Sequence, residues 1–171
     1  MKNEKIKRYL QVPTRTLITE LQQHFHPTLL KDLAQLMDLF DIVHKKHAEG
    51  NPKLAKAYNL FSQFSYRIPL HLFREEQILF PLLIEQENGS AVLTQASFRN
   101  MESEHDEDLL MIQAVAELTD NFTPPPQACK SWKKLYEKLE NFLSDLELHI
   151  AIENDVLFQR FQEKKGLKVA R

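Results

Sequence analysis

The chain contains two similar segments in which a histidine and a glutamate lie four residues apart. The first reads His71-Leu-Phe-Arg-Glu75 and the second His149-Ile-Ala-Ile-Glu153, and each glutamate is followed by two residues, then Ile or Val, then Leu-Phe. Residues four apart on an α-helix lie one turn apart on the same face, so each pair can point toward one metal ion. Because imidazole and carboxylate both bind transition metals, the segments are predicted to be the halves of one binuclear metal site.

Two further histidines, His26 and His105, occupy matched positions. His26 precedes His71 by 45 residues, and His105 precedes His149 by 44 residues. Each half of the chain therefore contributes a single histidine and then a His-Glu pair. All of these residues fall on seams that otherwise consist of Leu, Ile, Phe and Val. A carboxylate buried among such residues costs several kcal/mol unless a cation compensates its charge, which favours a metal site.

The predicted ligand set gives each of two metals two histidines and a share of both carboxylates. The six residues are His26, His71, Glu75, His105, His149 and Glu153. With both glutamates bridging, each metal keeps room for a bridging oxygen and an exogenous ligand, as in sites whose metals lie about 3.5–4 Å apart. Mixed nitrogen and oxygen ligation favours iron, with manganese and zinc as competitors. The alternative interpretation is that the histidines are hydrogen-bonded core residues and that the glutamates pair with Lys or Arg.

The elements that must position these ligands are predicted to be amphipathic helices. Apolar residues recur at steps of three and four, which is typical of helices that face a bundle core. We expect helices over 16–48, 52–87 and 97–120, and a fourth that starts at the prolines of 123–126 and runs to about 164. Long amphipathic helices with short connections predict an all-α, antiparallel four-helix bundle.

Finer expectations concern how these helices begin and which faces they bury. Asn51 is expected to cap the second helix, with Pro52 as its first residue. The buried seam of that helix is expected to continue from Glu75 to Ile78 and Leu82. The domain organisation is predicted to be a flexible arm over 1–13, the bundle over 14–164 and a frayed tail over 165–171.

Composition restricts the classes of function. With 171 residues the chain is expected to form one domain with a sizeable core. Its 22 basic and 24 acidic residues give no electrostatic footprint for nucleic acid or an acidic membrane surface. The single cysteine, Cys129, rules out an internal disulfide framework and a cysteine-based zinc site. No apolar run has the length of a signal peptide or a membrane span, so we expect a cytoplasmic protein.

Other polar and aromatic residues near the seams receive different interpretations. His24 and His44 lie off the seam and are expected at the surface, whereas His47 is expected to cap its helix or to support the site. Glu104 precedes a predicted ligand, so it either lines the approach to the metals, where it could relay protons, or is solvated. Glu76 is expected on a solvated face.

Two phenylalanines follow the paired segments and are expected to form walls of the metal site. They are Phe80 and Phe158, each five residues after a predicted bridging glutamate.

The chain resembles the hemerythrin-like di-iron proteins and, within them, the Repair of Iron Centres (RIC) proteins. The resemblance extends from about Thr16 to Phe161. The stretches that carry it are Arg74-Glu-Glu-Gln-Ile-Leu-Phe-Pro81, Met101-Glu-Ser-Glu-His-Asp-Glu107, Thr123-Pro-Pro-Pro126 and His149 to Phe158. It implies a four-helix bundle with a non-haem di-iron centre, an oxo or hydroxo bridge, four histidines and two bridging glutamates. Carried over residue by residue, these ligands are the six already predicted.

The chain departs from the pattern of this family in two ways. Typical members have an additional N-terminal domain with adjacent cysteines, whereas this sequence starts almost at the predicted bundle. Members also tend to have a glutamate one turn before the histidine of the second helix, where this chain has Arg67. A path for iron or protons that uses that carboxylate would therefore have to differ here.

The resemblance implies a role in nitrosative and oxidative stress defence. The first hypothesis is repair of damaged iron-sulfur clusters, reductive scavenging of nitric oxide at the di-iron centre, or both. The alternative is a protein without turnover that senses dioxygen or nitric oxide or donates iron. The expected partners are nitric oxide or dioxygen and damaged iron-sulfur proteins, with no nucleic acid and no membrane.

Overall fold

Helices account for nearly all of the structure. The computed structural model describes residues 2–90 and 93–162, and the tail predicted over 165–171 lies outside these residues. In chain order the helices are α1 (Lys2–Lys7), α2 (Thr14–Glu20), α3 (His26–His47), α4 (Pro52–Arg74), α5 (Phe80–Glu87), α6 (Gln95–Leu118), α7 (Lys130–Ala151) and α8 (Gln159–Gln162). Segments of π-helix join three pairs of them: η1 (Leu21–Phe25), η2 (Glu75–Leu79) and η3 (Ile152–Phe158). The predicted all-α class is confirmed.

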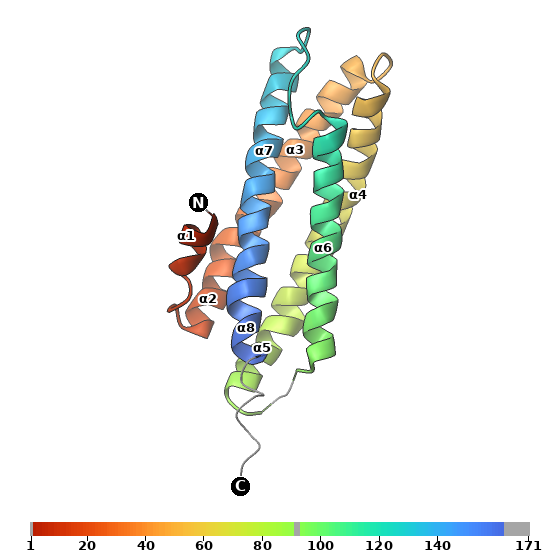
Figure 1. Ribbon diagram of the computed structural model, residues 1–171. Helices are drawn as coiled ribbons and strands as arrows, with labels where there is room; N and C mark the ends of the chain where they lie inside the picture. The colour runs from red at the N-terminus through yellow and green to blue at the C-terminus, as the bar shows by residue number, and fades with distance from the viewer. Residues whose placement is uncertain (1, 91–92, 163–171) are drawn as a thin grey trace.

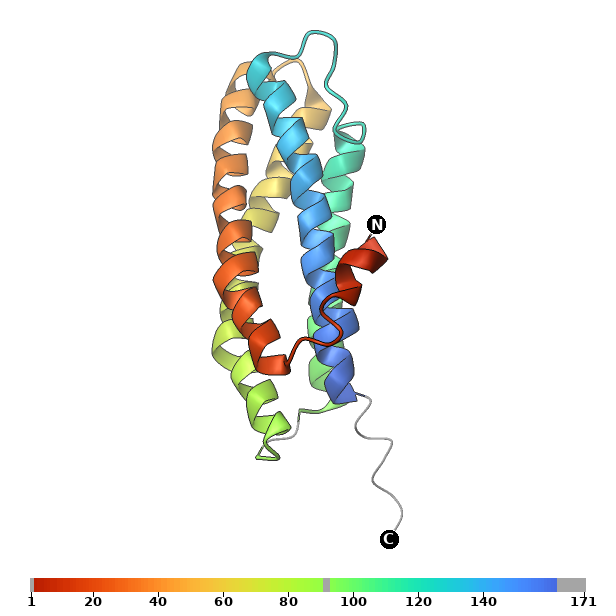
Figure 2. The same ribbon diagram turned by 90° about the vertical axis from the view of Figure 1, so that its left-hand side faces the viewer.

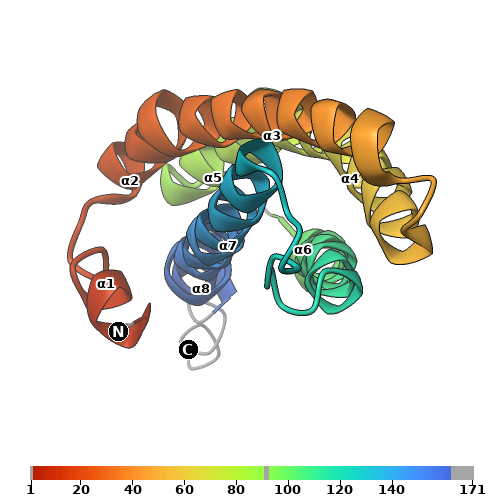
Figure 3. The same cartoon turned by 90° about the horizontal axis from the view of Figure 1, so that it is seen from above.

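The long helices form an antiparallel bundle. The α3 and α6 helices run in one direction along its axis, and α4 and α7 run in the other (Figures 1 and 2). The α3 helix packs against α4 and α7, and α6 completes the ring by packing against α4 and α7 as well (Figure 3). None of the helices in the described part of the chain is both long enough and apolar enough to span a bilayer.

The hydrophobic core is divided into two clusters along the bundle axis. The cluster nearer the α3–α4 connection includes Leu33, Phe61 and Leu139. The cluster at the opposite end includes Leu17 and Phe98. The six predicted metal ligands lie between the two clusters along every long helix, so a buried polar layer separates two apolar ones.

The predicted start of the second helix is confirmed, whereas that of the fourth is wrong. The Asn51 side chain accepts a hydrogen bond from the backbone N–H of Leu54 at 3.0 Å, and Pro52 is the first helical residue. The fourth helix begins only at Lys130, and the prolines stay in the connection before it. Phe122 in that connection is only 8% exposed, so its burial holds the chain across the end of the bundle before α7 can begin.

The π-helical segments change which residues face the core. Residues five apart point about 140° away from each other on an α-helix, but a π turn brings them onto one face. Glu75 and Phe80 are both buried across η2, and the seam continues through Leu83. Ile78 is 55% exposed, so the predicted seam through Ile78 and Leu82 was wrong by one residue.

The N-terminal segment differs from the predicted flexible arm. Residues 2–7 form α1, which packs against α7, and the Tyr9 ring is 1% exposed within the apolar cluster. Arg160 donates hydrogen bonds to the backbone carbonyls of Val12 at 2.7 Å and Tyr9 at 2.8 Å. One buried aromatic ring and one arginine clamp therefore hold the segment on the bundle, and neither is visible as a pattern in the sequence.

Replacing Arg160 by methionine should loosen this segment without unfolding the bundle. The substitution removes the two short hydrogen bonds already described and two longer ones, both 3.4 Å, to Thr14 Oγ1 and the carbonyl of Leu10, while retaining an apolar side chain. Hydrogen bonds to charged groups contribute about 1.5–3 kcal/mol each. Amide hydrogen exchange should become faster over residues 2–13 and remain unchanged in α4 and α6. Unchanged exchange over residues 2–13 would show that Arg160 does not hold the segment.

Candidate metal centre

The structure brings all six predicted ligands together in the polar layer. His26 begins α3, His71 lies in the last turn of α4, and His105 lies in the middle of α6. His149 lies near the end of α7, while the two glutamates lie at the start of η2 and within η3. All six are at most 5% exposed. Every long helix therefore supplies at least one group to a single buried site.

Each glutamate faces a different histidine with each of its two oxygens. Oε1 of Glu75 lies 3.3 Å from His71 Nε2 and 3.4 Å from His105 Nε2, while its Oε2 lies 3.7 Å from His26 Nε2. The carboxylate thus spans the space between two groups of imidazoles.

Glu153 spans the same space from the opposite helix. Its Oε1 lies 3.1 Å from His149 Nε2 and 3.7 Å from His26 Nε2, while its Oε2 lies 3.4 Å from His105 Nε2. Two groups of possible ligand atoms result: His26 and His149 with both glutamates, and His71 and His105 with Glu75. Glu75 belongs to both groups, and Glu153 reaches the second through its Oε2, 3.4 Å from His105 Nε2. That both carboxylates bridge two metals stays a prediction.

The donor atoms fit a pair of cations better than they fit one another. None of the four glutamate oxygens has a hydrogen-bond partner among the described residues, although each is buried. Buried polar atoms in proteins are almost always satisfied, so this cluster of unsatisfied acceptors points to bound cations. His71 Nε2 and His105 Nε2 lie 3.0 Å apart, which is about the separation of two nitrogens bound at right angles to one ion with bonds of ~2.1 Å.

The outer nitrogens of two histidines are held by residues that sequence reasoning did not assign to the site. Glu76 lies 2.7 Å from Nδ1 of His26, and Asn154 lies 2.7 Å from Nδ1 of His105. Such partners fix the ring so that Nε2 faces the metal. Each follows a predicted bridging glutamate directly, so the duplicated segments did contain this signal. Glu76 was therefore wrongly expected on a solvated face.

Glu104 holds the third histidine. Its Oε2 lies 3.0 Å from Nδ1 of His71 and also accepts a hydrogen bond from Arg74. Its carboxylate is 29% exposed and lines a surface pocket of about 400 Å³ with Arg67 and Glu107. Glu104 therefore lies beside the approach to the site, and its action as a proton relay stays a prediction.

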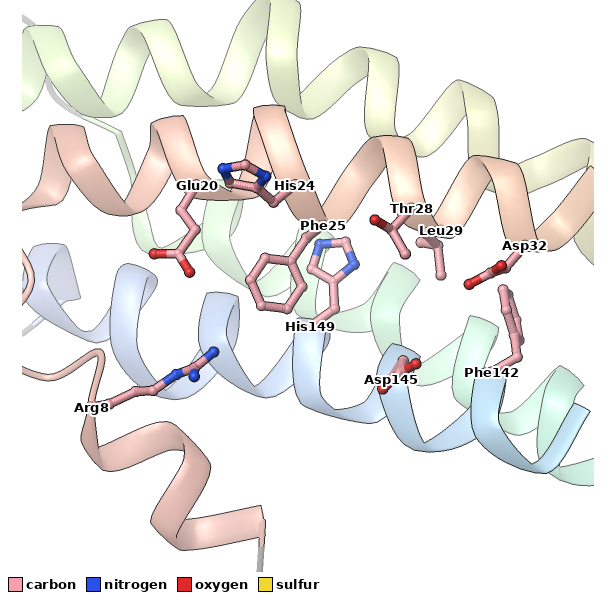
Figure 4. A pocket seen from close by; sticks show the side chains of 10 residues that line it. All are labelled: Arg8, Glu20, His24, Phe25, Thr28, Leu29, Asp32, Phe142, Asp145 and His149. Atoms are coloured by element: carbon pink, nitrogen blue, oxygen red, sulfur yellow. The ribbon is translucent and has the colours of Figure 1, made fainter. Parts of the chain in front are cut away.

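The outer nitrogen of His149 has no hydrogen-bond partner among the described residues. Phe25 precedes His26 as Glu104 precedes His105, but its ring packs against His149, with centroids 6.0 Å apart, and can accept no ordinary hydrogen bond. A pocket of about 330 Å³, whose lining includes Phe25 and Leu29, reaches this histidine from the surface (Figure 4). The site is thus symmetric in its inner donors and asymmetric in its outer partners.

Aromatic rings close the site at the positions expected from the sequence. Phe80 stacks on His26 with centroids 5.7 Å apart, and Phe158 stacks on His105 with centroids 6.0 Å apart. Each ring lies five residues after a bridging glutamate and reaches its histidine through a π turn. The π-helical segments therefore allow one continuous helix to direct both a predicted metal ligand and an aromatic ring toward the site.

The histidines that were not predicted as ligands lie away from this cluster. His24 is exposed, and His44 stacks on Tyr58 with centroids 4.1 Å apart. His47 lies at the far end of α3, where its Nε2 is 3.3 Å from Sγ of Cys129.

In the metal-free protein the cluster carries charges of both signs. Burial lowers the pKa of His71, but the Glu75 carboxylate and then Glu104 outweigh this and raise it to about 9. Burial and then Glu153 raise the pKa of Glu75, yet contacts with His105 and His71 outweigh both and lower it overall. Protonated imidazoles thus take the place of the cations, and a metal must displace those protons.

Replacing Glu75 and Glu153 together by leucine should abolish binding of a metal pair while keeping the fold. Without the carboxylates the remaining histidines can release their protons, so the variant then buries no charged group in this layer, and replacing buried charges by apolar groups is often neutral or stabilising by about 1–4 kcal/mol. We therefore expect metal analysis to find no iron pair and thermal unfolding of the metal-free variant to occur at an unchanged or higher temperature. Retention of two irons per chain would contradict the ligand assignment.

Metal binding should release protons and strengthen as the pH rises. Because the pKa of His71 is raised from 6.5 to about 9, its proton stabilises the metal-free protein fully below pH 6.5, and this contribution disappears as the pH rises through about 9. Calorimetric titration with Zn²⁺ in buffers of different ionisation enthalpy should detect release of at least one proton per chain near neutral pH. No release would show that the imidazoles are already neutral.

Comparisons with known proteins agree with this geometry. The model of the family described as "Hemerythrin HHE cation binding domain" matches residues 15–161. The iron-sulfur cluster repair protein YtfE of Escherichia coli is 34% identical over 155 residues, which cover 90% of this chain and 69% of the relative. The protein of the same name from Escherichia fergusonii gives the same values. The chain therefore belongs to the hemerythrin HHE family and, within it, to the iron-sulfur cluster repair proteins.

Proposed function

We propose that this protein holds a non-haem di-iron centre, with the six buried residues as ligands, and acts in nitrosative and oxidative stress defence. Its role would be the repair of damaged iron-sulfur clusters, the reductive scavenging of nitric oxide, or both. The observation that supports this most directly is the pair of glutamates whose oxygens each face different histidines without hydrogen-bond partners among the described residues. The name of the relatives supports the connection with iron-sulfur clusters.

The chemistry follows from what this donor set can do when iron is bound. A ferrous pair supplies two electrons, and reduction of two nitric oxide molecules to nitrous oxide and water consumes two electrons and two protons. His71 and His105 would be kept in a metal-binding orientation by Glu104 and Asn154. Glu104 also lines the surface pocket, together with Glu107 and Asp108, where protons from solvent would arrive. The proposal places this chemistry in the cytoplasm, with damaged iron-sulfur proteins as partners.

Iron donation is the second candidate, and the surroundings of His149 favour it. Loss of a partner at the outer nitrogen of a ligand typically weakens metal affinity about 10–100-fold. No side chain of the described residues holds the outer nitrogen of His149, so its partner can only be an exchangeable molecule such as water, and a pocket reaches this histidine from the surface. The iron beside His26 and His149 would therefore be the more easily released of the two.

Turnover is tested by mixing the reduced, iron-loaded protein with nitric oxide and measuring nitrous oxide. Up to one nitrous oxide molecule per iron pair is expected in a single turnover, because each product requires two electrons. The metal-free protein is the control. A yield no higher than this control would exclude reductive scavenging.

Donation is tested by reactivation of an iron-sulfur enzyme that has been damaged by nitric oxide. The iron-loaded protein should restore activity in the presence of a chelator that captures free iron, whereas an equal amount of ferrous salt should fail. If free iron is equally effective, the protein is not a specific donor.

A further inference from the structure

A small internal cavity lies beside the predicted metal ligands. Its volume is about 10 Å³, which is roughly the space that the centre of one water molecule needs. Leu29, Ile68 and Leu146 are among its apolar lining residues. Its polar lining consists of His71, His105, Asp108, His149 and Glu153. Asp108 is the one polar lining residue that is not a predicted metal ligand.

Asp108 connects this cavity with the surface. It is 2% exposed and lines both the inner cavity and the surface pocket beside Glu104. Arg67 Nε lies 3.2 Å from its Oδ1, but the alignment is too poor for a hydrogen bond, and this oxygen has no hydrogen-bond partner among the described residues. Arg67 does donate a hydrogen bond to Glu107, at 2.9 Å, and this bond keeps its guanidinium beside the Asp108 carboxylate. Arg67 therefore positions Asp108 without satisfying it.

The pseudo-symmetry of the site shows that Asp108 is a departure from an otherwise apolar arrangement. Asp108 lies three residues after His105, and the residue three after His26 is Leu29, which lines the same cavity. Asp108 therefore places a hydrogen-bond acceptor without a partner at the position where the other half of the site has the apolar Leu29.

His149 lines the same cavity and can supply a complementary donor. The outer nitrogen of His149 is buried without a partner, and it carries the proton when Nε2 is turned to a metal. A buried water needs a site of sufficient size and two to four polar partners. Asp108 as acceptor and His149 as donor supply two partners of opposite kind.

We propose that the inner cavity is a specific site for one water-sized molecule that bears O–H groups, with water itself as the resident. It donates a hydrogen bond to Asp108, which Arg67 positions, and accepts one from His149. If the site binds nitric oxide or dioxygen, as the proposed function requires, this molecule must leave before the diatomic ligand reaches the metals. Asp108 and Arg67 thus control ligand access by stabilising the resident molecule.

The resident water is tested in the zinc-loaded protein, which requires no redox activity. Oxygen-17 magnetic relaxation should detect one long-lived internal water that disappears in Asp108→Leu. It should persist in Asp108→Asn, which retains a polar side chain of the same size, and in Asp106→Leu, an identical substitution at an exposed position of the same helix. Persistence of the same water in a folded Asp108→Leu variant, or its absence from the unmodified protein, would overturn the proposal.

The effect on access is tested in the reduced, iron-loaded protein with nitric oxide as the probe. Asp108→Leu should accelerate nitric oxide association about 10-fold, since displacement no longer breaks a hydrogen bond worth about 1.4 kcal/mol. Asp106→Leu should associate at the unmodified rate. If nitric oxide associates with Asp108→Leu at the unmodified rate, Asp108 does not control access to the metals. If the unmodified protein binds no nitric oxide, reductive scavenging is excluded, whereas the zinc experiment still decides the water site.

Discussion

The burial of two carboxylates inside a helical bundle is the constraint on which this structure depends. Glu75 and Glu153 are 0% exposed and lie between two apolar clusters that exclude water from both sides. Charges in such a place are stable only opposite charges of the other sign. In the metal-free protein, protonated imidazoles meet this need, as the raised pKa of His71 indicates. Cations would meet it in the loaded protein, so metal binding and the stability of the polar layer are two aspects of one electrostatic requirement.

The duplication of the His-Glu segment explains much of the geometry, and its imperfections suggest where the function is located. The residue after each glutamate holds the single histidine of the neighbouring helix, and the phenylalanine five residues on stacks on that same histidine. The two halves differ at two pairs of equivalent positions. Phe25 in the first half corresponds to Glu104 in the second, and Leu29 corresponds to Asp108. One half of the site therefore has apolar side chains at the two positions where the other half has carboxylates paired with arginines. The two metal positions are therefore inequivalent even though their inner donors match.

The fold class and the six clustered residues were accessible from the sequence because each leaves a periodic signal. A histidine or glutamate on an apolar helical seam is visible wherever the period is regular. The π turns were not accessible, because they insert one residue into that period, and so Ile78 was assigned to the core in place of Leu79. Tyr9 and Arg160 were missed for another reason: a single buried aromatic ring and a single arginine that donates to three backbone carbonyls leave no repeating pattern. The pairing of Asp108 with Arg67 was not accessible either, because it depends on contact between two helices.

The central claim is that the buried cluster binds two irons that share the glutamates. Its most direct test is iron analysis of the anaerobically loaded and then oxidised protein, combined with its absorption spectrum. Two irons per chain and the charge-transfer band of an oxo-bridged ferric pair are predicted. A single iron per chain, or two irons whose spectrum lacks any bridge, would contradict the account.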